Sequence, residues 1–284
     1  MTLTVSPLKA PLAAYLAQPP QAAIRLFWLG QAGFVIEGGG RRLVIDPYLS
    51  DSLAQKYAGT RYPHSRMMPP PVAADEIRHV DAVLATHAHT DHLDLGTLPP
   101  LLEANPDAVL VVPRASLAVA ATRSGIAPGR LHGMDAGDEL ALPGLRIRAV
   151  RAAHERIERD GDGNHLFLGL AMRIGGATIL HTGDTIPFEG QSAELAALGA
   201  DLALMPVNGR DAERAAGGVP GNLTMEEAIL LCRSAGIDAL IAHHFGMFDF
   251  NTVPRAAVEA AARDSALAHA VAAETGLVYG LAQD

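Results

Sequence analysis

Residues Thr86 to His92 read Thr-His-Ala-His-Thr-Asp-His, a dense cluster of imidazoles with one carboxylate. The apolar run Asp81 to Ala85 precedes it and predicts a short buried strand, so the cluster lies where a strand ends and the chain turns toward the surface. His87 and His89 are two residues apart and point the same way in extended chain, whereas Asp91 follows a turn. Imidazole nitrogens and carboxylate oxygens are the usual ligands of Zn²⁺, Mn²⁺ and Fe²⁺. The cluster therefore predicts a site for one or two metal ions.

Further strand-like runs end on side chains of the same kind. They place His154 after 145–152, Asp184 after 178–180, and His243 and His244 after 239–242. Neighbouring residues in a strand face opposite sides, so only one of His243 and His244 can point into a shared site. The residues alone leave both alternatives open.

Short strand patterns alternate with helical patterns along the chain, which predicts an α/β class of fold. The expected strands are 24–29, 33–37, 42–45, 81–85, 108–112, 145–152, 166–174, 178–180, 200–207, 239–242 and 277–279. The expected helices are 71–79, 93–104, 116–124, 224–236 and a last one from 252–254 to 276. Thr224 and Glu227 form a capping-box pattern at the start of the fourth helix, and Gly236 stops it.

The length and the hydrophobic content of the chain limit how many domains it can form. The chain has 284 residues, of which 49% are hydrophobic, enough for a large core without disulfides. No linker, repeat or low-complexity tract interrupts residues 24–284, which we expect to form a single domain, with 1–23 as an N-terminal extension. The extension has several prolines and lacks the basic and apolar regions of a signal peptide.

Charge and cysteine content limit the compartment and the partners. The formal net charge of −9 repels polyanions, so we expect no non-specific nucleic-acid binding. No run approaches the roughly 20 apolar residues that span a bilayer, so no membrane partner is expected. Cys232 is the only cysteine, which excludes a disulfide framework and fits a cytoplasmic protein. The oligomeric state stays open, with a homo-oligomer as one expectation.

Several polar residues are candidates for second-layer or substrate contacts. Asp46 ends a strand before Pro47, where it can either hydrogen-bond a ligand histidine or simply start a turn. The long irregular segment 50–71 is expected to cover the site. Guanidinium forks suit anions, and loops carry most binding residues. The substrate-binding candidates are Arg66, His181, Asn208, Arg210 and His243.

Taken together, these motifs resemble those of the metallo-β-lactamase superfamily, whose His-x-His-x-Asp-His pattern is met at His87, His89, Asp91 and His92. Within it, the sequence looks most like the L-ascorbate-6-phosphate lactonase group. The residues that carry this likeness are Trp28-Leu29-Gly30, Asp81 to His87, Asp91-His92-Leu-Asp94, His181-Thr-Gly-Asp184 and the stretch from Ala242 to Phe250. The likeness covers most of the chain between Ile24 and Pro254.

The resemblance implies a four-layer αββα sandwich of two mixed β-sheets with helices on the outer faces. It also implies a dinuclear metal site with a divided set of ligands. One ion would be held by His87, His89 and His154, the other by Asp91, His92 and His244, with Asp184 bridging and His243 as the fallback for His244. The cofactors would be two divalent ions, Mn²⁺ or Zn²⁺, with Fe²⁺ also possible.

The implied activity is that of a metal-dependent hydrolase. A metal-bound hydroxide would open a small anionic ester, lactone or phosphorylated sugar acid, and Asp91 would manage the proton as a catalytic residue. Two alternatives use the same ligands: a phosphodiesterase or nuclease of the same superfamily, and an iron-containing redox or sensor protein. The negative charge disfavours the first, and the lack of sequence for a flavin domain after Gly280 disfavours the second.

Overall fold

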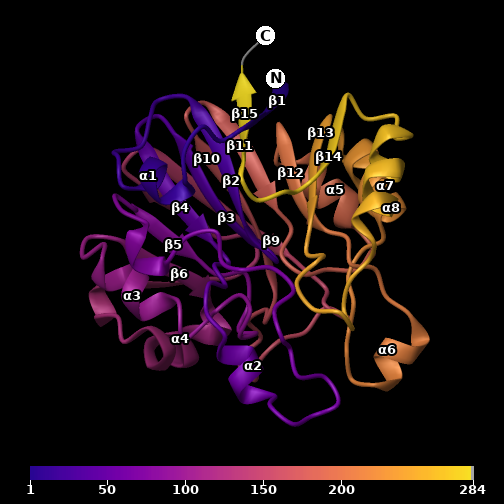
Figure 1. Cartoon of the computed structure of the whole chain (residues 1–284), viewed down its shortest axis with the longest axis horizontal. Helices are drawn as coiled ribbons and strands as arrows, with labels where there is room; N and C mark the ends of the chain where they lie inside the picture. Colours follow the sequence, from indigo (N-terminus) through magenta and orange to yellow (C-terminus); the bar gives the residue numbers. More distant parts are fainter. Residues whose placement is uncertain (283–284) are drawn as a thin grey trace.

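A computed structural model describes residues 1–282, so positions 283–284 of the expected domain lie outside the described part. An eight-stranded sheet takes up one half of the molecule (Figure 1). Its order is β1 (Thr2–Pro7), β15 (Leu277–Ala282), β2 (Ile24–Gly30), β3 (Gly33–Gly38), β4 (Arg41–Ile45), β5 (Ala82–Leu84), β6 (Val109–Pro113) and β7 (Leu131–Met134). Pairing is antiparallel from β1 to β4 and parallel from β4 to β7. The sheet is therefore mixed.

A seven-stranded sheet faces it and is also mixed. Its order is β14 (His269–Ala272), β13 (Ala239–His243), β12 (Leu202–Pro206), β11 (Ala177–His181), β10 (Leu168–Ile174), β9 (Leu145–Arg151) and β8 (Glu139–Leu142). Strands β11 to β14 run parallel, and β8 to β11 are joined by antiparallel pairing. The chain thus completes most of one sheet before it builds the other.

Helices cover the outer face of each sheet. On the indigo-to-magenta side of Figure 1 are α1 (Leu12–Leu16), α3 (Leu98–Glu103) and α4 (Leu117–Ser124), and on the orange-to-yellow side are α5 (Gln191–Ala196), α7 (Met225–Ala235) and α8 (Arg255–Arg263). Two short helices, α2 (Ser52–Lys56) and α6 (Ala212–Ala216), project together at one end of the sandwich. Short 3₁₀ turns occupy Ala74–Glu76, Arg114–Ser116 and Pro128–Arg130. The architecture is the expected αββα sandwich.

Side-chain alternation along the strands explains why the sheets stack. On β2, Leu26 and Trp28 belong to the core between the two sheets, whereas Phe27 and Leu29 pack under the helices on the outer face. Successive side chains of a strand face opposite sides, so a strand covered on both faces is apolar throughout. No helix among residues 1–282 combines the length and the apolar character needed to cross a bilayer.

Residues 1–23, expected to precede the domain, contribute β1 and α1. Strand β1 pairs antiparallel with β15, so the two ends of the described chain lie side by side at one sheet edge. A glycine turn joins β10 to β11, with φ of +58° at Gly175 and +91° at Gly176. The predicted capping box is also confirmed: Thr224 Oγ1 accepts from the Glu227 amide at 3.2 Å, and the Glu227 carboxylate accepts from the Thr224 amide at 2.9 Å.

Three helix predictions are wrong in extent. The helix expected over 71–79 is only a single 3₁₀ turn, and the one expected over 93–104 begins at Leu98. The alanine-rich segment expected to be helical up to 276 ends its helix at Arg263 and then forms β14. Strand β14 pairs in parallel with β13 and closes the sheet edge, so tertiary pairing overrides the local helix propensity of alanine.

Candidate metal centre

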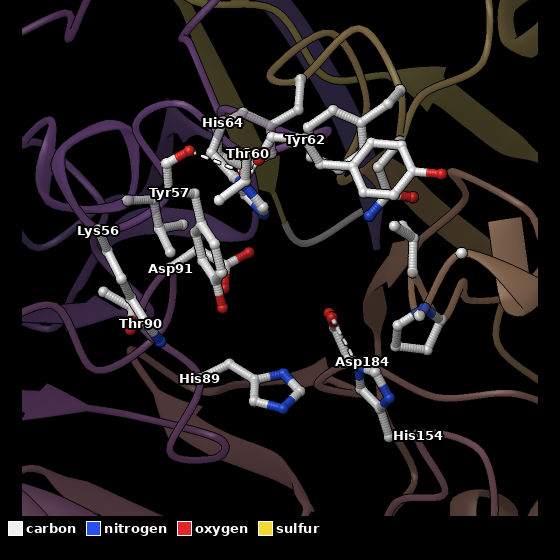
Figure 2. A pocket seen from close by; sticks show the side chains of 18 of the residues that line it. Lys56, Tyr57, Thr60, Tyr62, His64, His89, Thr90, Asp91, His154 and Asp184 are labelled. Carbon is white, nitrogen blue, oxygen red and sulfur yellow. Dashed lines mark hydrogen bonds and ion pairs between the residues drawn. The ribbon is translucent and has the colours of Figure 1, made fainter.

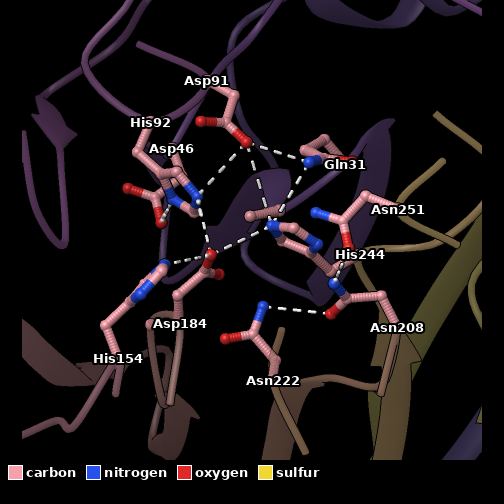
Figure 3. Close-up of polar contacts among 12 residues, drawn as sticks. Gln31, Asp46, Asp91, His92, His154, Asp184, Asn208, Asn222, His244 and Asn251 are labelled. Carbon is pink, nitrogen blue, oxygen red and sulfur yellow. Dashed lines mark hydrogen bonds and ion pairs between the residues drawn. The ribbon is translucent and has the colours of Figure 1, made fainter. Parts of the chain in front are cut away.

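Side chains from loops at the ends of several strands meet at one end of the sandwich, as Figure 3 shows for part of the set. Their potential ligand atoms form three groups, each with all its atoms within 4.8 Å of one another. The groups are His87, His89 and His154; His87, His92 and Asp184; and Asp91, His92 and His244. All seven residues expected as ligands are therefore brought together. Shared members join the groups into a single cluster.

Asp184 lies at the middle of this cluster. Its Oδ2 atom is 3.1 Å from His244 Nε2, 3.5 Å from His92 Nε2 and 3.7 Å from His154 Nε2. These histidines come from loops after three different strands. A carboxylate oxygen so placed can contact two ions at once.

The backbone after β11 explains how Asp184 reaches that position. Gly183 has φ of +63°, and a Cβ there would lie 2.5 Å from the carbonyl oxygen of Leu168. Only glycine fits both the left-handed conformation and the close approach. The turn after β11 therefore needs glycine just before Asp184.

The backbone also separates His243 from His244. His243 is the last residue of β13, and its ring packs against Phe34 at 5.4 Å and His181 at 4.8 Å between centroids. His244 leaves the strand with φ of +65°, and its amide donates to the carbonyl of Gln31 at 2.9 Å. This turn directs the His244 ring into the cluster and leaves His243 in the interior.

Asp46 positions His92 from behind. Its Oδ2 atom is 2.7 Å from His92 Nδ1 and accepts from Thr86 Oγ1 at 2.7 Å, while Oδ1 accepts from the Thr86 amide at 2.8 Å. All three side chains are buried. A proton on His92 Nδ1 leaves the Nε2 lone pair directed at the cluster, the usual arrangement for a histidine that binds metal.

Gln31 is a neighbour of the cluster that the sequence pattern did not predict. Its Nε2 donates to Asp91 Oδ2 at 2.9 Å and lies 3.2 Å from His244 Nε2. The residue is buried with φ of +50° in the turn between β2 and β3. A glutamine in a glycine-flanked turn gives no local signal of such a contact, because the contact depends on pairing distant parts of the chain.

Asp94, just after the cluster, connects it to the segment that carries α2. Its carboxylate accepts from Ser50 Oγ at 2.7 Å, Ser52 Oγ at 2.6 Å and Thr97 Oγ1 at 2.5 Å. Asp94 is fully buried, so these bonds are shielded from water. The covering segment is thereby attached to the histidine-rich loop.

Burial and charge shift the pKa values of the cluster histidines in opposite directions. Burial lowers the pKa of His154 to about 4 and that of His87 well below its usual value, so both rings are neutral with a free lone pair. Burial also lowers the pKa of His92, but the carboxylates of Asp184, Asp46 and Asp91 outweigh it and raise that pKa well above the usual value. The carboxylates thus stabilise positive charge here.

Several buried polar atoms of the cluster have no hydrogen-bond partner among the described residues. They include His87 Nε2, His92 Nε2 and Asp184 Oδ1. Buried polar atoms are nearly always paired, and leaving one unpaired costs about 1–3 kcal/mol. Neutral imidazoles and carboxylates are donors for divalent transition metals, so this cluster fits one or two such ions.

The five candidate substrate contacts lie away from the open part of the site. His181 is buried, with Nε2 2.9 Å from the Ala32 carbonyl. Arg66 donates to the Tyr48 carbonyl at 3.0 Å. The other three are His243 in the interior, Asn208 bonded to Asn222 and Asn251, and Arg210 paired with Glu227. None of the five lines the cavity that opens beside the cluster.

A cavity of about 710 Å³ opens beside the cluster (Figure 2). His89, Asp91, His154, Asp184 and His244 form its inner end. Its outer walls come from the segments that carry α2 and follow α6, together with the loop after β13. The lining there includes Lys56, Tyr57, Arg61, Tyr62, His64, Val219, Phe248 and Phe250. Such a cavity can accommodate a small organic molecule next to the metal-binding atoms.

Comparison with known proteins agrees with this geometry. Residues 41–245 match the family described as "Beta-lactamase superfamily domain". A UPF0173 metal-dependent hydrolase of Pelotomaculum thermopropionicum is 31% identical over 192 residues, covering 65% of this chain and 72% of the relative.

Two solved structures show the same fold. Igni18, a metallo hydrolase of Ignicoccus hospitalis, has a TM-score of 0.65 at 20% identity, covering 92% of this chain and 100% of its own. An isothiocyanate hydrolase from Delia radicum gut bacteria has a TM-score of 0.69 at 20% identity, covering 91% and 99%.

Proposed function

Because this chain belongs to the UPF0173 metal-dependent hydrolases of the metallo-β-lactamase superfamily and is a metal-dependent hydrolase, we propose that it opens a small anionic ester, lactone or phosphorylated sugar acid. Reactions of the L-ascorbate-6-phosphate lactonase kind fall within this class. The observation that carries the proposal is the Asp184 carboxylate, which lies within 3.7 Å of three histidines beside an open cavity.

The ligand roles follow the three groups of neighbouring donors. His87, His89 and His154 would hold one ion, and Asp91, His92 and His244 the other, with Asp184 shared. Mn²⁺ and Zn²⁺ both suit these nitrogen and oxygen donors, and Fe²⁺ is admitted by the same set. When bound, such ions lower the pKa of a coordinated water toward about 7 and polarise the bond to be cleaved.

Side chains of the protein orient the candidate ligands and transfer the proton. Asp46 keeps His92 in one orientation through its hydrogen bond to Nδ1, and Gln31 holds the Asp91 carboxylate through Oδ2. Asp91 also lines the cavity, so its carboxylate can accept the proton of the attacking water and return it to the leaving oxygen. This gives Asp91 a catalytic role in addition to its role as a ligand.

The charge of the outer cavity supports an anionic substrate. Lys56 and Arg61 are exposed there and form no ion pair with any described carboxylate. Each instead lies over an aromatic ring, with Lys56 Nζ 4.9 Å from the Tyr57 centroid and Arg61 Cζ 5.0 Å from the Tyr62 centroid. Unpaired cations beside the entrance attract anions in a chain that is otherwise negative.

The test combines metal analysis with a substrate panel. Protein purified without added metal is assayed for bound Mn, Zn and Fe, then incubated with carboxylate-bearing esters, lactones, sugar phosphates, phosphodiesters and thioesters. We expect hydrolysis of an anionic ester, lactone or sugar-acid phosphate. Metal-loaded protein that cleaves none of these classes would overturn the proposal. Cleavage of phosphodiesters alone would favour the alternative function, a phosphodiesterase.

The His89→Ala variant examines the ligand assignment within the same assay. We expect it to lose turnover and bound metal while remaining folded, because His89 is exposed to the cavity rather than packed in the core. His132→Ala is the matched control, since His132 is a partly exposed histidine on β7 outside the cluster. Full activity in His89→Ala would mean that this residue is not a ligand.

A further inference from the structure

Aromatic side chains gather on the outer wall of the cavity, away from the metal-binding atoms. They come from two segments distant in sequence, the one after α2 and the one after β13. The members of this aromatic wall are Tyr57, Tyr62, His64, Phe248 and Phe250. Figure 2 shows Tyr57, Tyr62 and His64 across the cavity from His154 and Asp184. With only 5% Phe, Trp and Tyr in the whole chain, this local concentration calls for a physical reason.

His64 is the centre of the aromatic wall. Its ring stacks on Tyr57, with centroids 4.3 Å apart and planes at 22°. The edges of Phe250 and Phe248 meet it at 4.7 Å and 5.0 Å, and Phe250 also lies 4.8 Å from Tyr62. Stacked and edge-to-face rings at these distances attract one another, so the rings form one connected surface.

The aromatic wall is held in place before any ligand arrives. His64 has φ of +53°, and its Nδ1 lies 2.6 Å from the Tyr62 carbonyl. Burial lowers the pKa of His64, which keeps its ring uncharged near neutral pH. The Tyr62 hydroxyl rests against Gly217, where a Cβ would lie 2.3 Å from it. A surface fixed in this way loses little conformational entropy when a ligand binds.

Part of the aromatic wall remains available for contact. Tyr57, Tyr62 and Phe250 are only half-buried, and all line the same cavity as the exposed His89. Aromatic surface left open inside a cavity gains free energy when an apolar group covers it. The Phe248 and Phe250 rings offer a sugar hydroxyl no hydrogen-bonding group to replace water.

We propose that the aromatic wall binds a flat apolar group of the substrate, such as a benzyl or phenyl ring, while the bond to be cleaved lies at the His89 and Asp184 end. This inference rests on the proposed hydrolase function and narrows its substrates to anionic esters and lactones that carry such a group. Neither the histidine cluster nor the family assignment specifies it.

The first experiment compares two esters that differ only in this group. Monobenzyl succinate and monomethyl succinate share the carboxylate and the ester, and their leaving alcohols have similar acidity. We expect kcat/KM for the benzyl ester to be higher by about tenfold or more, because the ring is buried against the aromatic wall. Monocyclohexylmethyl succinate, which is apolar but not flat, should fall between them.

Substitutions in the aromatic wall test whether its rings cause the preference for the benzyl ester. Phe250→Leu keeps the residue apolar but removes a ring, and Tyr62→Leu does the same at a second position. We expect either to reduce the ratio of kcat/KM for the benzyl ester to kcat/KM for the methyl ester several-fold. Phe188→Leu is the matched control, because Phe188 is also half-buried but packs against Arg151 outside the cavity. A benzyl preference that both wall variants retain would overturn the assignment.

A binding measurement separates this inference from the proposed function. N-benzylsuccinamate and N-methylsuccinamate, the amide analogues, are added to metal-free protein and binding is followed by saturation-transfer NMR. We expect transfer to the benzyl ring, weakened by Phe250→Leu and unchanged by Phe188→Leu. Ring binding without ester hydrolysis would support the aromatic wall and count against the esterase chemistry. Equal hydrolysis of both esters without ring binding would overturn the inference and leave the hydrolase function standing.

Discussion

At the scale of single residues, Asp46 shows how one buried carboxylate can organise a site that it does not enter. Its φ of +46° is unusual for a residue other than glycine, and asparagine and aspartate tolerate this region best. From there it accepts from both the amide and the hydroxyl of Thr86 and holds His92 Nδ1. The sequence left two interpretations of Asp46, a turn residue or a hydrogen-bond partner of a candidate ligand histidine. The structure shows the hydrogen bond to His92.

Asp46→Asn should weaken metal binding without unfolding the chain. Asparagine fits the same backbone, but its amide nitrogen would face groups that now donate to a carboxylate. We expect the affinity for Mn²⁺ or Zn²⁺ to fall by about 10–100-fold, as for other partners of ligand histidines. Competition with a chromophoric chelator measures it. Wild-type affinity in the variant would show that His92 needs no such partner.

Lys56→Met should affect anionic substrates selectively. Lys56 is exposed and unpaired with any described carboxylate, so its attraction for a substrate anion is screened by water. Exposed ion pairs are weak, and we expect KM to rise by only about two- to fivefold, with kcat unchanged. Steady-state kinetics on monobenzyl succinate and neutral benzyl propionate provide the comparison. An equal rise for both esters would point to lost packing on Tyr57 instead.

At the scale of elements, buried polar contacts join the first sheet to the segments that pack against it. Arg42 on β4 is the clearest case: its guanidinium is fully buried beside the Glu37 carboxylate. It also donates to the carbonyls of Leu16 at 2.7 Å, Gln18 at 2.9 Å and Arg78. One side chain thus joins α1 and the segment before β5 to the sheet.

Arg42→Met should destabilise the fold. Removing one partner of a fully buried pair leaves Glu37 with Arg25 alone and three carbonyls without their donor. We expect the free energy of unfolding to fall by about 3–5 kcal/mol, measured by urea denaturation. Arg146→Met is the control, because its pair with Glu139 is exposed and should contribute at most about 1 kcal/mol. Equal losses in the two variants would contradict this account.

At the scale of the whole molecule, the candidate metal centre joins the two halves of the sandwich. His87, Asp91 and His92 follow β5 of one sheet, whereas His154, Asp184 and His244 follow strands of the other. Bound ions would therefore link the two sheets at one end of the molecule. Binding that requires both sheets in place stabilises the folded state over the unfolded one.

Metal removal should lower the melting temperature as well as abolish activity. At a free metal concentration about 100 times Kd, each bound ion adds roughly 2.7 kcal/mol, which corresponds to a shift of about 5–10 °C per ion for a domain of this size. Differential scanning calorimetry before and after treatment with EDTA measures this shift, and added Mn²⁺ or Zn²⁺ should restore it. His87→Ala/His244→Ala, which lacks a donor for each ion, should be insensitive to EDTA. If the melting temperature of the wild type did not change with metal, metal binding would not be coupled to folding.

The sequence by itself determined the features that rest on nearby residues. The capping box of α7 was predicted from spacing and residue type, and the His-x-His-x-Asp-His stretch was identified as a group of candidate ligands in the same way. The resemblance to the metallo-β-lactamase superfamily implied that the donors at the strand ends form one dinuclear site. That donor atoms from both sheets lie within 4.8 Å of one another agrees with the implied sandwich.

Only the tertiary structure decided the features that rest on distant residues. Gln31 reaches Asp91 because two loops meet. The ring of His244, which the resemblance favoured over His243, enters the cluster because the φ of His244 is positive. Strand β14 forms from a helix-favouring segment because it completes a sheet edge. The aromatic wall likewise exists only where 57–64 meets 248–250. Local propensities are worth tenths of a kcal/mol, and long-range pairing and burial outweigh them.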